Sequence, residues 1–183
     1  MMIDEKSKDS DNEKNKFGEK FKGDEAKNDT TKSGSIKSGV IKSKRALENI
    51  VNENIGYIKS TAPNVHCLTN VVTMQDVANM LLAAGGSAIM AQDIKEMEEI
   101  TQITSATLLN MGVPSDEKIA AYIAAGKCAN KLGHPVIFDP VGVGASNYRK
   151  KCANDILANV YPDIIRCNQE EAKVLLEFKN FGR

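Results

Sequence analysis

Five short apolar runs along this 183-residue chain are each followed by a residue that could contact a ligand. Each run has the length and composition of a buried β-strand, which places these residues at strand ends. They are Asn70, Met90, Asn110, Asp139 and Arg166, and four of the five are polar. In an open parallel sheet, ligands bind beyond the carboxyl ends of the strands. Several polar groups along that edge therefore predict a ligand site.

The segment 139–145 reads Asp-Pro-Val-Gly-Val-Gly-Ala and holds the most informative of these strand ends. Two glycines in the loop let the backbone approach a ligand closely. The loop amides could then bind a phosphate, and Asp139 could bind it through Mg²⁺. An ordinary turn from strand to helix, with Asp139 capping the loop, explains the same residues, and the spacing alone does not separate the two hypotheses.

A second candidate is Asn168-Gln169-Glu170-Glu171. An asparagine followed three residues later by glutamate has the form of a capping box, and spacing alone favours that interpretation. A carboxylate beside Arg166 could also hold a hydrated metal ion and a nucleotide phosphate. The two roles are compatible, because the same pair can cap a helix and bind a metal through water. His66, inside a predicted strand, is more typical of a core residue than of a catalyst.

Strand and helix patterns alternate along the chain and would position these residues. Strands are predicted over 65–68, 87–90, 107–110, 136–138 and 163–166, and helices begin near residues 45, 73, 94, 115, 148 and 168. Thr73 is predicted to cap its helix, with Val72 and Val77 forming a hydrophobic staple. Gly133 is expected to end the helix that Ser115 begins. This alternation predicts an α/β fold with a parallel sheet covered by helices.

Composition limits the partners and the compartment. Lysine plus arginine and aspartate plus glutamate both number 24, so the zero net charge indicates neither nucleic acid nor an anionic membrane as a partner. Four cysteines without a CxxC pair, and only two histidines, argue against structural zinc. The chain shows no secretory segment and no run of about 18 apolar residues, so we expect a cytoplasmic protein with reduced thiols. Residues 1–44 are predicted to be a disordered charged tail, and 45–183 the domain.

Five blocks of residues together resemble the hydroxyethylthiazole kinase family, over about residues 63–177. The blocks are His66-Cys67-Leu68-Thr69-Asn70, Asp76-Val77-Ala78-Asn79, Ala88-Ile89-Met90-Ala91, the 139–145 loop, and Ile165-Arg166-Cys167-Asn168 with Glu171. The resemblance implies a three-layer ribokinase-like fold and a homotrimer. It implies ATP-dependent phosphorylation of 4-methyl-5-(2-hydroxyethyl)thiazole, with Mg²⁺, in thiamine biosynthesis and salvage. Residue by residue, it implies that Met90 and Asn70 bind the substrate, Arg166 and Asn168 bind ATP, and Asp139 and Glu171 hold the metal.

Three departures from the family pattern accompany this resemblance. Val71 replaces a usual tyrosine, and Cys167 replaces a usual glycine. Family members continue beyond the point that corresponds to Arg183, and that part carries the glycine-rich catalytic loop with its cysteine. We therefore expect a C-terminally truncated domain with no catalytic residue of its own, impaired activity and an uncovered apolar sheet face. The alternatives are a non-catalytic thiazole-binding or decayed remnant, and another ribokinase-like kinase, for instance one acting on a pyrimidine alcohol.

Overall fold

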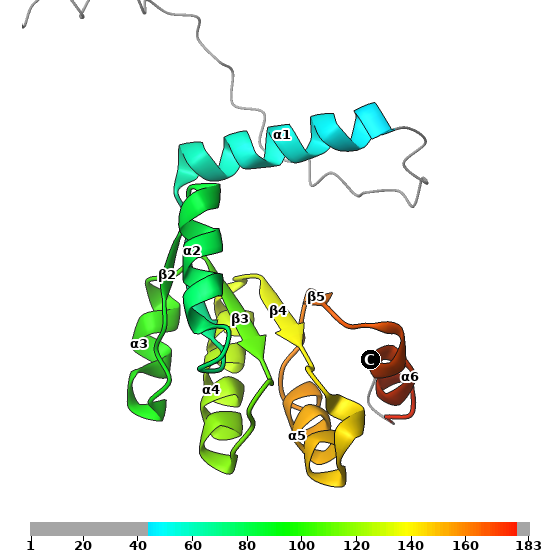
Figure 1. Cartoon of the computed structure of the whole chain (residues 1–183). Helices are drawn as coiled ribbons and strands as arrows, with labels where there is room; N and C mark the ends of the chain where they lie inside the picture. Colours follow the sequence, from blue (N-terminus) through cyan, green and yellow to red (C-terminus); the bar gives the residue numbers. More distant parts are fainter. Residues whose placement is uncertain (1–43, 179–183) are drawn as a thin grey trace, which may run out of the picture. The chain divides into compact units, whose positions relative to one another are not determined.

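The computed structural model describes residues 44–178, so nearly all of the predicted tail, residues 1–43, and also residues 179–183 lie outside the described residues. Five parallel strands form one sheet of order β2-β1-β3-β4-β5 (Figure 1). The strands are β1 (Asn64–Leu68), β2 (Ser87–Ile89), β3 (Ala106–Asn110), β4 (Val136–Asp139) and β5 (Ile164–Ile165). The predicted parallel α/β sheet is confirmed, although the last strand is shorter than the predicted 163–166.

Helices alternate with these strands, as predicted. They are α1 (Lys44–Thr61), α2 (Met74–Ala84), α3 (Met97–Gln102), α4 (Asp116–Leu132), α5 (Asn147–Leu157) and α6 (Gln169–Leu176), with short 3-10 turns η1 (Ile94–Glu96) and η2 (Val143–Ala145). The predicted helix over 94–103 is thus a 3-10 turn followed by α3. Between residues 44 and 178, no helix is both long enough and apolar enough to cross a membrane.

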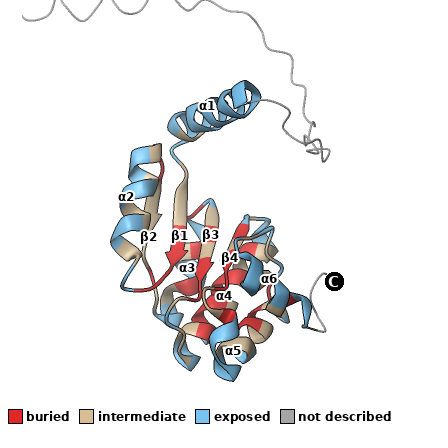
Figure 2. Cartoon of the chain, turned by 45° about the vertical axis from the view of Figure 1, so that its right-hand side comes forward, coloured by how far each residue is buried: buried red, intermediate tan, exposed pale blue. Residues whose placement is uncertain are grey.

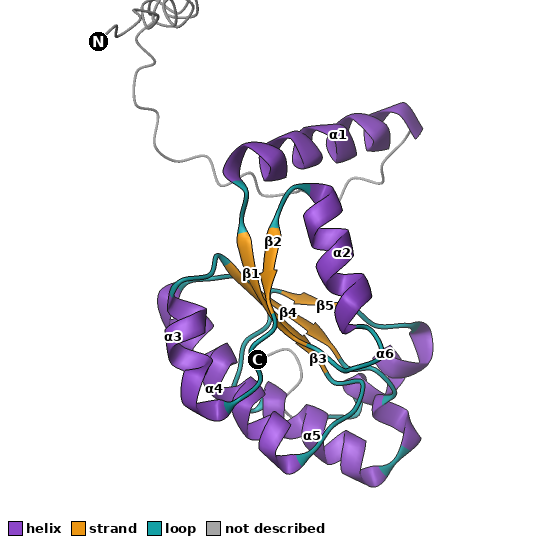
Figure 3. Cartoon of the chain, turned by 60° about the vertical axis from the view of Figure 1, so that its left-hand side comes forward, coloured by secondary structure: helices purple, strands orange, loops and turns teal. Residues whose placement is uncertain are grey.

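The order of the strands decides which helices cover which face of the sheet. The chain steps from β1 to β2 in one direction, then returns past β1 to β3, β4 and β5 in the other. Because parallel crossovers are right-handed, this reversal puts α2 on one face and α3, α4 and α5 on the other. In Figure 3, α2 lies on one side of the orange strands, and α3 and α4 lie on the other. The predicted three-layer arrangement is confirmed.

The core lies between the sheet and the layer of α3, α4 and α5. Its buried side chains include Leu109 and Phe138 from the strands and Met97, Tyr122 and Ile156 from the helices. Figure 2 shows the buried residues concentrated in the central strands and in α4, while α1 is exposed along its length. The most deeply buried part of the described domain is therefore the central strands together with α4.

The α2 face of the sheet is covered less completely. Leu108, Ile137 and Ile164 are partners in register across β3, β4 and β5 and point away from the α4 layer. Leu108 and Ile137 are half-buried and Ile164 is 57% exposed. Of these three side chains, only that of Ile164, in β5, is mostly exposed.

Local capping predictions had mixed outcomes. Ser115 caps α4 by accepting from the Lys118 amide at 3.3 Å, and Gly133 ends that helix with φ +72°, as predicted. The predicted cap at Thr73 is wrong, because its hydroxyl lies 3.0 Å from the Thr69 hydroxyl and does not bond the helix. The staple is wrong too, since Val72 is 77% exposed. The turn before α2 is built by Asn70 instead.

Candidate functional site

A continuous chain of hydrogen bonds links polar side chains at the ends of four strands. Asn70, after β1, donates from Nδ2 to Asn110 Oδ1 at 3.0 Å. Asn110, the last residue of β3, donates from Nδ2 to Asp139 Oδ2 at 2.7 Å. Arg166, after β5, donates from Nη1 to the same oxygen of Asp139 at 3.1 Å. The convergence of these residues on one edge of the sheet, expected from the sequence, is confirmed.

The position of this chain of side chains in the fold favours ligand binding. β1 lies between β2 and β3, so the loops after β1 and β3 leave towards opposite faces of the sheet. In doubly wound sheets, the crevice opened by such a reversal is where ligands bind. The bond between Asn70 and Asn110 joins β1 to β3 at this reversal, and the two residues are only 5% and 8% exposed. The Arg166 side chain is 77% exposed.

The turn after β1 is shaped by Asn70 itself. Its Oδ1 accepts from the Val72 amide at 3.0 Å, and its carbonyl oxygen accepts from the amides of Thr73 and Met74. This Asx-type turn holds the Asn70 side chain at the start of α2 and leaves Val72 on the surface. Met90, directly after β2, is half-buried, and no described hydrogen bond links it to Asn70. Met90 and Asn70 thus follow the adjacent strands β2 and β1, but no described hydrogen bond joins the two side chains.

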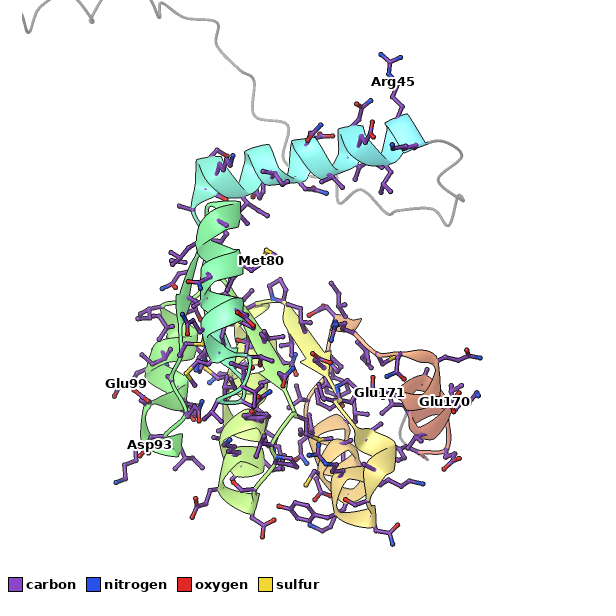
Figure 4. All side chains as sticks on the ribbon, in the orientation of Figure 1. Arg45, Met80, Asp93, Glu99, Glu170 and Glu171 are labelled. Carbon is purple, nitrogen blue, oxygen red and sulfur yellow. The ribbon has the colours of Figure 1, made fainter. Side chains whose placement is uncertain are left out.

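Glu171 fastens the glycine loop to α6. Its Oε1 accepts from the Gly142 amide at 2.9 Å, and its Oε2 accepts from the Asn168 amide at 3.0 Å. The Asn168 side chain accepts in return from the Glu171 amide at 2.9 Å, which completes the predicted capping box. In Figure 4, Glu171 points from α6 towards the rest of the domain, whereas Glu170 points away from it. Gly142 has φ +67°, a conformation that favours glycine.

The amides of this loop are mostly occupied by protein acceptors. Val141, Val143 and Ala145 donate to the carbonyl oxygens of Asp139, Pro140 and Gly142, respectively, and the Gly142 amide bonds Glu171. These four amides therefore do not form the phosphate cradle that the sequence pattern suggested. The loop instead shapes the wall beside Asp139.

Arg149, in α5, was not predicted as a site residue. Its guanidinium donates to the carbonyl oxygens of Val141 at 2.9 Å, Gly112 at 2.9 Å and Met111 at 3.3 Å. Arg149 thereby ties the loop after β3 to the loop after β4. No spacing signal pointed to it, because an arginine in the first turn of a helix resembles a surface residue. Asn110 did end an apolar run, and that signal was sufficient to find it, although no role was assigned to it.

The carboxylates fit a partly hydrated divalent cation better than a metal site built from protein ligands alone. No group of three or more His, Cys, Asp or Glu side chains within residues 44–178 could hold a metal. Asp139 uses Oδ2 for Asn110 and Arg166, and no described group donates to its Oδ1. Mg²⁺ commonly takes one or two carboxylates together with water and substrate phosphates. Asp139 Oδ1 suits that role directly, and Glu171, with both oxygens already accepting amides, suits it through water.

Burial explains the ionisation of the groups around this edge. His66 in β1 is fully buried and its Nδ1 lies 3.0 Å from Thr101 Oγ1; burial lowers the pKa of this imidazole, which favours its neutral form. Burial also raises the pKa of Tyr122, whose hydroxyl donates to the backbone carbonyl of Asn110 at 2.9 Å. His66 is thus the core residue that the pattern indicated, and Tyr122 anchors the end of β3.

Comparisons with known proteins identify the family to which this chain is similar. The hydroxyethylthiazole kinase family model matches residues 55–183. A hydroxyethylthiazole kinase of Clostridium botulinum (strain Alaska E43 / Type E3) is 52% identical over 118 residues, which cover 64% of this chain and 42% of the relative. One of Clostridium acetobutylicum is 48% identical over 126 residues, covering 69% and 46%.

A solved structure supports the same assignment. The hydroxyethylthiazole kinase protein of Pyrococcus horikoshii OT3 superposes with a TM-score of 0.67 at 33% identity, over 70% of this chain and 51% of that one. The chain spans less than half the length of the two clostridial relatives. The residues matched by the family model, 55–183, include all of the strand-end side chains. This chain belongs to the hydroxyethylthiazole kinase family.

Proposed function

We propose that this chain forms the substrate- and nucleotide-binding edge of a hydroxyethylthiazole kinase. The reaction is ATP-dependent phosphorylation of 4-methyl-5-(2-hydroxyethyl)thiazole, in thiamine biosynthesis and salvage. The observation that supports it best is the hydrogen-bonded chain from Asn70 to Arg166, which joins a buried amide to a carboxylate and an exposed guanidinium. A kinase needs a neutral binding site for its alcohol substrate beside a binding site for the nucleotide phosphates. Here the neutral Asn70 amide lies next to the charged pair of Asp139 and Arg166, to which Asn110 joins it.

The substrate half of the site contains Asn70 and Met90. Asn70 is 5% exposed, and no described group accepts the second hydrogen of its Nδ2. A buried N–H without a protein acceptor favours a ligand oxygen or nitrogen as its partner. The half-buried Met90 thioether is polarisable and adapts to the face of a flat heterocycle. A small thiazole alcohol suits both groups.

The phosphate half contains Arg166, Asp139 and Glu171. Because the Arg166 side chain is mostly exposed, its ion pair with Asp139 adds little stability and leaves most guanidinium donors available to a nucleotide phosphate. Asn168, beside Arg166, opens α6 and lies where it can contact the same nucleotide. When bound, Mg²⁺ would neutralise charge on the transferring phosphate. Phosphoryl transfer depends mainly on such positioning and charge stabilisation, which is the work proposed for these residues.

The proposal assigns binding and orientation to this chain. No described residue is given the role of accepting the substrate proton, and the relatives are more than twice as long as the segment they share with this chain. We further propose that the active enzyme is cytoplasmic and that it is a homotrimer. The molar mass measured by light scattering tests the homotrimer. A non-catalytic thiazole-binding protein remains the alternative outcome of the experiments below.

Calorimetry on the 183-residue chain tests the binding proposal directly. We expect the thiazole alcohol to bind, and Mg²⁺·ADP to bind with an affinity that falls at least about fivefold in Asp139→Asn and Arg166→Gln, since each loses a charge-assisted contact. Asp155→Asn is the matched control, because the Asp155 carboxylate pairs with Lys151 on the surface of α5 and with no other described side chain. Equal losses in the control and the site variants, or no thiazole binding by the wild type, would contradict the proposal.

A turnover assay separates the two outcomes. Phosphorylated thiazole should form from ATP when the chain is supplied with a fragment corresponding to the C-terminal part of a relative. Binding without product in that mixture would favour the non-catalytic alternative. Preferential phosphorylation of a pyrimidine alcohol in a substrate panel would favour a different kinase of the same fold.

A further inference from the structure

Asn110 holds a central position among the strand-end side chains. Its Oδ1 accepts from Asn70 Nδ2 and from the Gly112 amide, both at 3.0 Å, and its Nδ2 donates to Asp139 Oδ2 at 2.7 Å. Its backbone carbonyl is held by the buried Tyr122 hydroxyl at 2.9 Å. The oxygen of the Asn110 side chain therefore faces Asn70, and its nitrogen faces Asp139.

We propose that Asn110 is a positioning residue: it sets the direction of the Asn70 amide and ties the substrate half of the site to the phosphate half. This inference rests on the proposed function, because it assigns a role within that same site. Asn110 acts through Asn70 and Asp139, and it is not proposed to touch the substrate itself.

The direction of both amides follows from groups whose hydrogen-bonding roles are invariable. A backbone N–H only donates, so the Gly112 amide requires the oxygen of Asn110 on its side. An ionised carboxylate only accepts, so Asp139 requires the nitrogen of Asn110 on the other side. A rotated Asn110 amide would oppose both contacts at once. Its oxygen therefore faces Asn70, which must present nitrogen.

The other end of the chain agrees independently. The Val72 amide donates to Asn70 Oδ1, so the oxygen of Asn70 faces Val72 and its nitrogen faces Asn110. Both asparagines are almost completely buried, where an opposed pair of donors or acceptors is costly. The Asn70 amide is consequently locked with one N–H left over for a ligand. The Asp139 carboxylate in the phosphate half thus fixes the direction of the Asn110 amide, and through it the direction of the Asn70 amide in the substrate half.

A purely structural role for Asn110 makes a different prediction. If Asn110 only stabilised the fold, its removal would lower stability, and any loss of affinity would be independent of Asn70. If Asn110 acts by holding the Asn70 amide, removing Asn110 should no longer change the affinity for the thiazole alcohol once Asn70 has no amide. The two cases are distinguished by a double-mutant cycle.

The cycle uses the full chain and calorimetry with the thiazole alcohol. Asn70→Ala and Asn110→Ala should each weaken binding by about fivefold, the factor that one hydrogen bond of about 1 kcal/mol represents. The double variant should bind no more weakly than Asn70→Ala, whereas independent effects would multiply to roughly 25-fold. Asn130→Ala is the control, because the Asn130 side chain bonds the backbone of Tyr161, before β5, and no other described group. Multiplying effects would overturn the inference.

Nuclear magnetic resonance without ligand keeps the inference testable if the wild type binds no thiazole. Failure of wild-type binding would count against the proposed function alone. The side-chain amide resonances of Asn70 should move in Asn110→Ala and stay in place in Asn130→Ala; unmoved resonances in both would overturn the positioning role. If Asn110→Ala does not fold, Asn110→Ser replaces it, since serine can keep the turn to the Gly112 amide but cannot reach Asn70.

Discussion

A methyl group added at Gly112 would point at the side chain of Asn70. A Cβ built there lies 2.9 Å from Asn70 Cγ and 3.0 Å from Asn110 Oδ1, both closer than carbon normally tolerates. The backbone of Gly112 is not in the left-handed region, so alanine adds no conformational strain. Because the added Cβ would lie nearest the Asn70 amide, we expect this amide to be pushed away and its bond to Asn110 to break.

The size of the effect follows from the bonds that this movement breaks. The 3.0 Å bond from Asn70 to Asn110 is lost, which corresponds to about 1 kcal/mol. Affinity for the thiazole alcohol should therefore fall by about fivefold. Stability should fall by a similar about 1 kcal/mol, or about 3–5 °C in Tm for a domain of this size.

Calorimetry and thermal unfolding of Gly112→Ala measure both quantities. Gly133→Ala is the matched control: nothing lies within 4 Å of its added Cβ, but its φ of +72° is strained for alanine. That strain should cost at least about 1 kcal/mol of stability and leave thiazole affinity unchanged. Wild-type affinity in Gly112→Ala, or an equal loss of affinity in the control, would show that the bond between Asn70 and Asn110 does not support thiazole binding.

Three further perturbations test other parts of the structure. Gly126→Ala places a Cβ 2.6 Å from both methyl groups of Val160 and should cost about 1–3 kcal/mol in urea unfolding, with Val160→Ala restoring part of it. Burial lowers the pKa of His66, so as the pH falls the unfolded chain binds this proton before the folded chain does. The free energy of unfolding should therefore be highest above about pH 6.5 and fall at lower pH by up to about 1.4 kcal/mol per pH unit. The fall should be smaller in His66→Asn. Iodoacetamide should modify the exposed Cys167 before Cys67, because burial raises the pKa of Cys67 to about 11. Bound Mg²⁺·ADP should slow the modification of Cys167. If mass spectrometry shows no such protection, the result would contradict a nucleotide bound at α6.

Local chemistry accounts for most of what could be predicted about the elements. Apolar runs and turn residues predicted all five strands, because a buried parallel strand must be apolar and must end in a polar loop. The capping box of Asn168 and Glu171 was readable because its partners are three residues apart. Thr73 misled the prediction, since the competing turn made by Asn70 depends on where β1 delivers that side chain.

The candidate site divides in the same way. The α/β class and the residues that end each strand could be predicted from the sequence, since both depend on neighbours in the chain. The fold was needed to show that Asn110 joins Asn70 to Asp139, that Arg149 ties two loops together, and that Glu171 accepts from the Gly142 amide. Those contacts join residues about 8 to 40 positions apart. Their partners are set by strand order and register, which no local spacing records.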